Sequence, residues 1–177
     1  MINLPPSADS SIDQIGVVVR DVRQVAEQLT RLLGIGPFRI LEYPIPGIDA
    51  QTTYLGRPAS YRVLLGFAQL GATQLELVQP LEGRSIWEDF LEQHGPGLHH
   101  FRVTIPNFDE MVAAWEAAGI QNLASGTGAH VGSKWAYFDT ASLLDGIIVE
   151  LRKKMDESKG EGQWATTAST SENGAQE

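Results

Sequence analysis

Four side chains that can bind a metal ion stand at matching places in two halves of this 177-residue chain. Residues 13–22 resemble residues 99–108, and each segment begins a strand followed by a helix. Each half then ends on a hydrophobic strand that carries one glutamate. The four side chains are Gln14 and Glu76 in the first half and His100 and Glu150 in the second. This arrangement predicts one metal site shared between two repeats.

The expected helices support the duplication. Asp21 is followed by Gln24, and Asn107 by Glu110, so each helix begins with a capping pair. Behind each cap, apolar residues recur at helical spacing, and a glycine then ends the helix. These residues are Val22, Val25, Leu29, Leu32 and Gly34 in the first half and Phe108, Met111, Trp115 and Gly119 in the second. Because the two helices share one sequence offset, a duplicated unit is the simplest explanation.

Composition excludes several classes of protein. The absence of cysteine removes disulfides, thiolate ligands and a thiol nucleophile. Residues 1–11 contain no apolar run suited to a signal peptide, and no transmembrane run follows, so we expect a cytoplasmic protein with no membrane partner. A formal net charge of -9 without a basic stripe argues against nucleic-acid binding. The expected partner is a small-molecule substrate.

The order of elements predicts an α+β fold. Two tandem βαβββ modules would form one curved, mixed, mainly antiparallel sheet with a central cup, and the helices would lie outside. The expected parts are an N-terminal extension (1–10), a first module (11–81), a connector with a short helix (82–97), a second module (98–154) and a disordered tail (155–177). Ser85 and Glu88 form a capping box for the connector helix. Edges and an apolar rim left by module pairing favour a homodimer.

Strand alternation assigns the polar side chains to one face of the sheet. Side chains two residues apart share a face, so each of the four potential ligands lies opposite the hydrophobic residues of its strand. Solvent exposure is the ordinary explanation for such a face. The repeat favours a shared site instead, because it brings the four groups together across the halves. Adjacent strand residues face opposite sides, and His100 stands at the position equivalent to Gln14, so His100 is expected to face the cup. His99 is expected to point away as a structural residue.

Arg102 shares the face of His100, and a buried guanidinium needs a carboxylate partner or an anionic ligand. A structural salt bridge and the binding of a substrate carboxylate, phosphate or enolate oxygen are both open.

Other polar residues are weaker candidates. His94 is expected at the surface or at a helix end, and Glu42 is expected to face solvent. His130 lies in the glycine-rich segment 125–134, which lacks the order of a phosphate-binding loop and is expected to be a flexible loop over the cup. The long insert 43–60 suggests a pocket wall.

Three stretches resemble one family. Residues 74–81 read QLELVQPL, residues 90–100 read FLEQHGPGLHH, and residues 146–151 read GIIVEL. These resemble the vicinal oxygen chelate (glyoxalase, bleomycin resistance and dioxygenase) superfamily, closest to its methylmalonyl-CoA epimerase-like and glyoxalase-like proteins. The resemblance implies one divalent metal ion, with zinc, manganese, cobalt, nickel and iron open. The ligands it implies are Gln14, Glu76, His100 and Glu150.

Two positions depart from the epimerase pattern. Epimerases that resemble this chain usually have His where Gln14 stands and often Gln where Glu76 stands, whereas eukaryotic-type glyoxalases use Gln, Glu, His and Glu. The ligand set therefore suits a metal, while the substrate assignment is weakened.

The resemblance implies proton abstraction next to a carbonyl, with a metal-stabilised enolate. Glu150 is expected to be the base and Glu76 a second acid or base. The expected function is a metal-dependent isomerase, epimerase or lyase acting on a small carbonyl or acyl-thioester compound. The alternatives are a glyoxalase-type lyase and a non-catalytic small-molecule-binding protein of the antibiotic-sequestering kind.

Overall fold

A computed structural model describes residues 11–45 and 48–156 of the chain. The extension predicted at residues 1–10 and most of the predicted tail, residues 157–177, lie outside the described residues. None of the described helices is long and apolar enough to cross a membrane.

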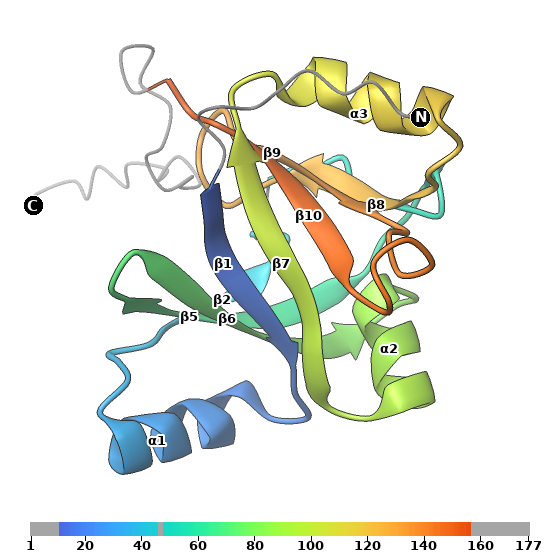
Figure 1. Cartoon of the computed structure of the whole chain (residues 1–177). Coiled ribbons are helices and arrows are strands. Elements are labelled where there is room, and N and C mark those ends of the chain that lie inside the picture. Colours follow the sequence, from blue (N-terminus) through green and yellow to red (C-terminus); the bar gives the residue numbers. More distant parts are fainter. Residues whose placement is uncertain (1–10, 46–47, 157–177) are drawn as a thin grey trace, which may run out of the picture.

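Eight strands form a curled sheet in the order β2-β5-β6-β1-β7-β10-β9-β8 (Figure 1). The strands are β1 (Ser11–Val18), β2 (Arg39–Tyr43), β5 (Arg62–Leu70), β6 (Thr73–Glu82), β7 (Gly97–Ile105), β8 (Asn122–Thr127), β9 (Lys134–Phe138) and β10 (Ile148–Lys153). A short hairpin, β3 (Thr53–Tyr54) and β4 (Arg57–Pro58), is inserted between β2 and β5. The helices are α1 (Val22–Leu33), α2 (Ile86–His94) and α3 (Phe108–Ala117).

Each half of the sheet is one βαβββ module, as the repeat predicts. The first strands of the two modules, β1 and β7, pair antiparallel at the centre, and each pairs in parallel with the last strand of its own module, β6 or β10. All remaining pairs of the large sheet are antiparallel. The α+β class and the mixed, mainly antiparallel sheet are confirmed. The hairpin β3–β4 is an addition to the first module.

Helices α1 and α3 cover the outer face of the sheet (Figure 1). Asp21 caps α1 as predicted, since its Oδ1 accepts from the backbone N–H of Gln24 at 3.0 Å. The predicted side-chain cap of α3 is wrong, because the Asn107 side chain makes no capping hydrogen bond. Leu32, expected on the buried face of α1, is 66% exposed.

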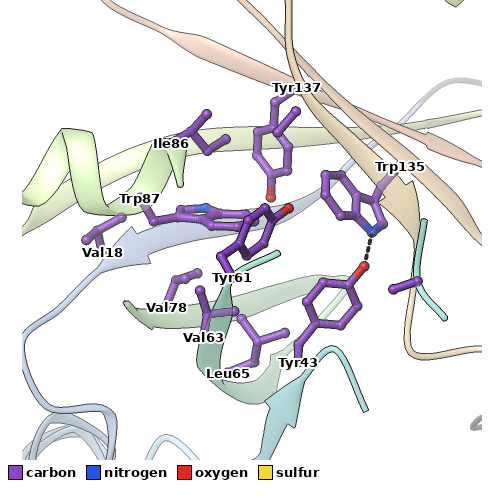
Figure 2. Close-up of a cluster of buried hydrophobic side chains, with 12 residues drawn as sticks. Val18, Tyr43, Tyr61, Val63, Leu65, Val78, Ile86, Trp87, Trp135 and Tyr137 are labelled. Carbon is purple, nitrogen blue, oxygen red and sulfur yellow. Dashed lines mark hydrogen bonds between the residues drawn. The ribbon is translucent and has the colours of Figure 1, made fainter. Parts of the chain in front are cut away.

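An aromatic cluster fills one part of the concave side. Figure 2 shows Trp87 of α2 beneath Tyr137, with Tyr61 and Trp135 nearby. The indole of Trp135 donates to the hydroxyl of Tyr43 at 3.2 Å (Figure 2). Ser85 caps α2 as predicted, accepting from the N–H of Glu88 at 3.2 Å. These aromatic side chains form the floor of the cup.

The insert after β2 connects the two edges of the sheet. The N–H of Leu55 donates to the carbonyl of Leu123 at 2.8 Å, and the N–H of Thr127 donates to the carbonyl of Ala50 at 2.9 Å. The hydroxyl of Tyr43 also donates to the carbonyl of Thr127 at 2.6 Å. The insert therefore ties edge strand β8 to the first module and closes one side of the cup.

Candidate metal centre

Four polar side chains from the four central strands meet inside the cup. Gln14 lies on β1, Glu76 on β6, His100 on β7 and Glu150 on β10, and all four are buried. Gly16 of β1 pairs with both Glu76 and His100, while Glu150 pairs with Arg102 on β7. Because these strands are neighbours, the alternation within each strand is enough to bring the four side chains together.

The distances are short enough for one small cation. His100 Nε2 lies 3.3 Å from Glu76 Oε2 and 3.3 Å from Glu150 Oε2. Gln14 Oε1 lies 3.4 Å from the same nitrogen. One ligand atom each from Glu76, His100 and Glu150 lie within 4.8 Å of one another. The group thus offers an imidazole nitrogen, two carboxylates and an amide oxygen around one point.

The charges of this cluster depend on one another. Burial disfavours a charged imidazole, but hydrogen bonds to Glu150 and Glu76 outweigh it and raise the pKa of His100 to about 9. Burial also raises the pKa of Glu150, yet His100, Arg102 and Arg152 together hold that pKa below its usual range. Glu150 is therefore ionised at neutral pH, as a general base must be.

Tyr137 on β9 holds one of the two carboxylates. Its hydroxyl donates to Glu150 Oε2 at 3.0 Å. Burial and the nearby Glu150 and Glu76 keep the pKa of Tyr137 well above its usual range, so the hydroxyl remains a donor. The hydrogen bond fixes the position of Glu150 relative to His100.

The residues fit a divalent cation. Glu76 Oε2 is buried, and its contact with His100 Nε2 is long, at 3.3 Å, so this oxygen remains available as an acceptor for a cation. In one orientation the Gln14 amide nitrogen donates to Glu150 Oε2 at 3.2 Å and its oxygen accepts from Arg102 Nη1 at 2.8 Å. In the other orientation its oxygen points toward His100 Nε2, 3.4 Å away. A cation favours the second orientation. Three oxygen donors and one imidazole suit a first-row divalent metal with open positions.

Arg102 forms the salt bridge that the sequence left open. Its Nε lies 2.8 Å from Asp13 Oδ1. A bulge on β1 between Ile12 and Gln14 interrupts the strand register beside Asp13. The role of Arg102 in substrate binding stays a prediction.

A cavity of about 70 Å³ lies beside the cluster. Glu76 and Glu150 contribute to its wall, and the aromatic rings of Tyr43 and Trp135 form part of the floor. His130 also lines the cavity, with Gly128, Ala129 and Ser133 of the same loop. The glycine-rich segment therefore lies over the cup, as expected.

The remaining candidates lie elsewhere. Glu42 pairs with Arg62 at 3.2 Å and does not line the cavity. His94 is exposed near the end of α2 and stacks on Phe90, with ring centroids 4.9 Å apart. His99 is buried, and its Nδ1 lies 3.1 Å from Nδ1 of His100.

Two residues of the site were missed by sequence reasoning. Tyr137 could have been found from alternation in the strand predicted at residues 134–139, where Trp135 and Tyr137 share a face. Nothing in the sequence indicated that Asp13 belongs to the site, because strict alternation places its side chain on the other face of the strand from Gln14.

Comparisons with known proteins agree with this architecture. A sequence model of the Glyoxalase/Bleomycin resistance protein/Dioxygenase superfamily matches residues 13–138. Methylmalonyl-CoA epimerase from Mycobacterium tuberculosis has a similar structure, with 16% identity, a TM-score of 0.64, and 90% of this chain and 98% of that chain covered.

Two further structures are similar. A Streptomyces coelicolor methylmalonyl-CoA epimerase variant in complex with 2-nitronate-propionyl-CoA has 19% identity, a TM-score of 0.61, and 82% of this chain and 97% of that chain covered. A hypothetical protein from Bacillus halodurans C-125 has 22% identity and a TM-score of 0.61, covering 84% of this chain and 96% of that chain. No curated protein sequence matches the chain. At these identities the structural likeness shows the fold alone.

Proposed function

Because the chain belongs to the glyoxalase/bleomycin resistance protein/dioxygenase superfamily, the vicinal oxygen chelate superfamily, we propose that it is a divalent-metal-dependent isomerase, epimerase or lyase. Its reaction begins with removal of a proton next to a carbonyl group of a small substrate. The observation that carries this proposal is the buried group of Glu76, His100 and Glu150 at a cavity wall. Burying two carboxylates costs free energy, which a bound cation offsets.

Gln14, Glu76, His100 and Glu150 would hold the metal ion. When bound, a divalent cation supplies Lewis-acid stabilisation of an enolate oxygen. The aromatic floor and the loop that carries His130 limit access of water to the cup.

Glu150 acts as the base in this proposal. It is ionised, and the hydrogen bond from Tyr137 fixes its carboxylate. Oxygens of Glu76 and Glu150 both lie 3.3 Å from His100 Nε2, and the Glu76 carboxylate can accept or return a proton. Two carboxylates on opposite sides of a planar enolate permit epimerisation, whereas return of the proton to the neighbouring carbon gives glyoxalase-type isomerisation.

Substrates of the methylmalonyl-CoA epimerase kind, small acyl thioesters, are the first to test. The ligand set of Gln14, Glu76, His100 and Glu150 favours glyoxalase-type chemistry as the second candidate, since eukaryotic-type glyoxalases use the same residue types. A metal-free binding protein is the outcome that would overturn both.

The experiment combines metal analysis with solvent exchange. Metal content is measured by mass spectrometry on untagged wild-type protein and on E76Q, E150Q and, as a control outside the cavity, E42Q. We expect nearly one divalent ion per chain in the wild type and E42Q, and a loss in the other two. Deuterium uptake from solvent into methylmalonyl-CoA and into a methylglyoxal-derived thiohemiacetal should then require metal and Glu150. Protein that neither contains nor takes up metal would contradict the proposal.

We also propose a homodimer. Ile12 on β1 and Leu98 on β7 are 60% and 55% exposed on the two central strands, which leaves apolar surface for a second copy. Sedimentation equilibrium tests this, and a monomer at micromolar concentration would contradict it.

A further inference from the structure

Two arginine side chains line the cavity, although the chain as a whole carries a formal charge of -9. Arg102 and Arg152 both line the cavity, and His130 lies across from them. The Nη2 atom of Arg152 lies 3.4 Å from His130 Nδ1. Burial and the charges of Arg152, Arg102 and Arg39 lower the pKa of His130 to about 4, so all three guanidinium groups act on this ring.

The two cavity arginines differ in their partners. Arg102 is neutralised by Asp13 at 2.8 Å. No carboxylate among the described residues forms a salt bridge with Arg152, although Glu150, Asp13 and Glu76 lie near enough to act on its charge. Its Nη2 atom also lies 3.7 Å from the sulfur of Met155. A partly buried guanidinium that forms no salt bridge is suited to an anionic ligand.

The position of Arg152 relative to the candidate metal centre sets a spacing. Arg152 follows Glu150 by two residues on β10, so both side chains lie on the cup face, about 6.6 Å apart along the strand. An anionic group at Arg152 would therefore lie farther along β10 than an oxygen pair at the metal, within the span of one small molecule.

We propose that Arg152, with His130 beside it, is an anion subsite that binds a carboxylate or phosphate group at the far end of the substrate. This inference rests on the proposed function and makes that function more specific by naming the substrate class. The class is small oxo or acyl compounds with a second anionic group.

Isothermal titration calorimetry with three probes tests the subsite. The probes are 2-oxoglutarate, its phosphonate analogue 2-oxo-4-phosphonobutyrate, and 5-methyl-2-oxohexanoate, in which two methyl groups replace the distal carboxylate oxygens. We expect at least one probe with a distal anionic group to bind the wild type about tenfold or more tightly than 5-methyl-2-oxohexanoate, which keeps the C1 carboxylate but has an uncharged distal end. The arm that binds more tightly identifies carboxylate or phosphate as the natural group.

Variants assign this preference to Arg152. R152Q should remove the preference while leaving affinity for 5-methyl-2-oxohexanoate unchanged, and R152K should keep part of the preference. R57Q, at an exposed arginine of the β3–β4 hairpin, should match the wild type. If R152Q does not fold, the probe preference of the wild type and of R152K still tests the subsite. Equal binding of all probes to the wild type, or a preference that survives in R152Q, overturns the subsite.

Repeating the titrations with and without added Mn²⁺ separates the two proposals. A preference that depends on Arg152 but not on metal supports the subsite and contradicts the metal-dependent function. Metal-dependent binding without any such preference supports the function and overturns the subsite.

Discussion

The Nδ1 atoms of His99 and His100 lie 3.1 Å apart within the core. Burial, with the charges of His100 and His94, holds the pKa of His99 well below its usual range, so this ring is neutral and can accept a hydrogen bond. His100 then keeps its proton on Nδ1 and presents Nε2 to Glu76 and Glu150. His99 is thus placed to fix the tautomer and ring orientation of His100.

Replacing His99 by Phe should weaken divalent-metal affinity by roughly 10- to 100-fold, because the ring of His100 loses its acceptor. Competition with a chromogenic chelator measures this. H94F, at an exposed ring, is the matched control and should bind metal as the wild type does. Unchanged affinity in H99F would show that the contact does not orient His100.

Gly16 leaves the space that the ring of His100 occupies. A β-carbon at Gly16 would overlap the imidazole, so G16A should displace His100 and abolish metal binding. G97A is the matched control, since a β-carbon there meets no atom within 4 Å. Circular dichroism should show folded protein in both variants. Full metal content in G16A would mean that the ring can move without losing the site.

Metal binding should release about one proton at pH 7. The raised pKa of His100, about 9, means that its imidazole is protonated at neutral pH without metal, and a cation must displace that proton. Affinity should therefore rise about tenfold per pH unit up to about pH 9 and level off above it. Calorimetry in buffers of different ionisation enthalpy counts the protons, and an enthalpy independent of buffer would contradict this prediction.

Closure of the cup depends on the hydroxyl of Tyr43. In Y43F the buried indole N–H of Trp135 and the carbonyl of Thr127 both lose a partner, so we expect a loss of about 1–3 kcal/mol in the free energy of unfolding. Urea denaturation measures the loss, and hydrogen exchange in β8 should accelerate. Y54F removes the partly buried hydrogen bond to Asp89 and should cost less. An equal cost in both variants would argue against this role.

Much of the fold could be predicted from local patterns. The repeat located both modules, because matching caps and apolar spacing recur at one offset, and Ser85 and Asp21 cap their helices as expected. Asn107 does not, since a capping residue type permits the hydrogen bond without enforcing it.

The sequence by itself determined which face each candidate ligand occupies, because side chains alternate strictly along a regular strand. That was sufficient to gather Gln14, Glu76, His100 and Glu150, whose strands are neighbours in the sheet. Their roles in metal binding and catalysis stay predictions.

Only the tertiary structure decided the partners of these side chains. Asp13 pairs with Arg102 beside a bulge that alternation does not foresee. Tyr137 meets Glu150 because β9 and β10 pair in one particular register. His130 reaches Arg152 from a loop, where no periodicity exists to predict direction. Periodicity is local and fixes a face, whereas partners are set by the register of strands and by loops that meet across long sequence separations.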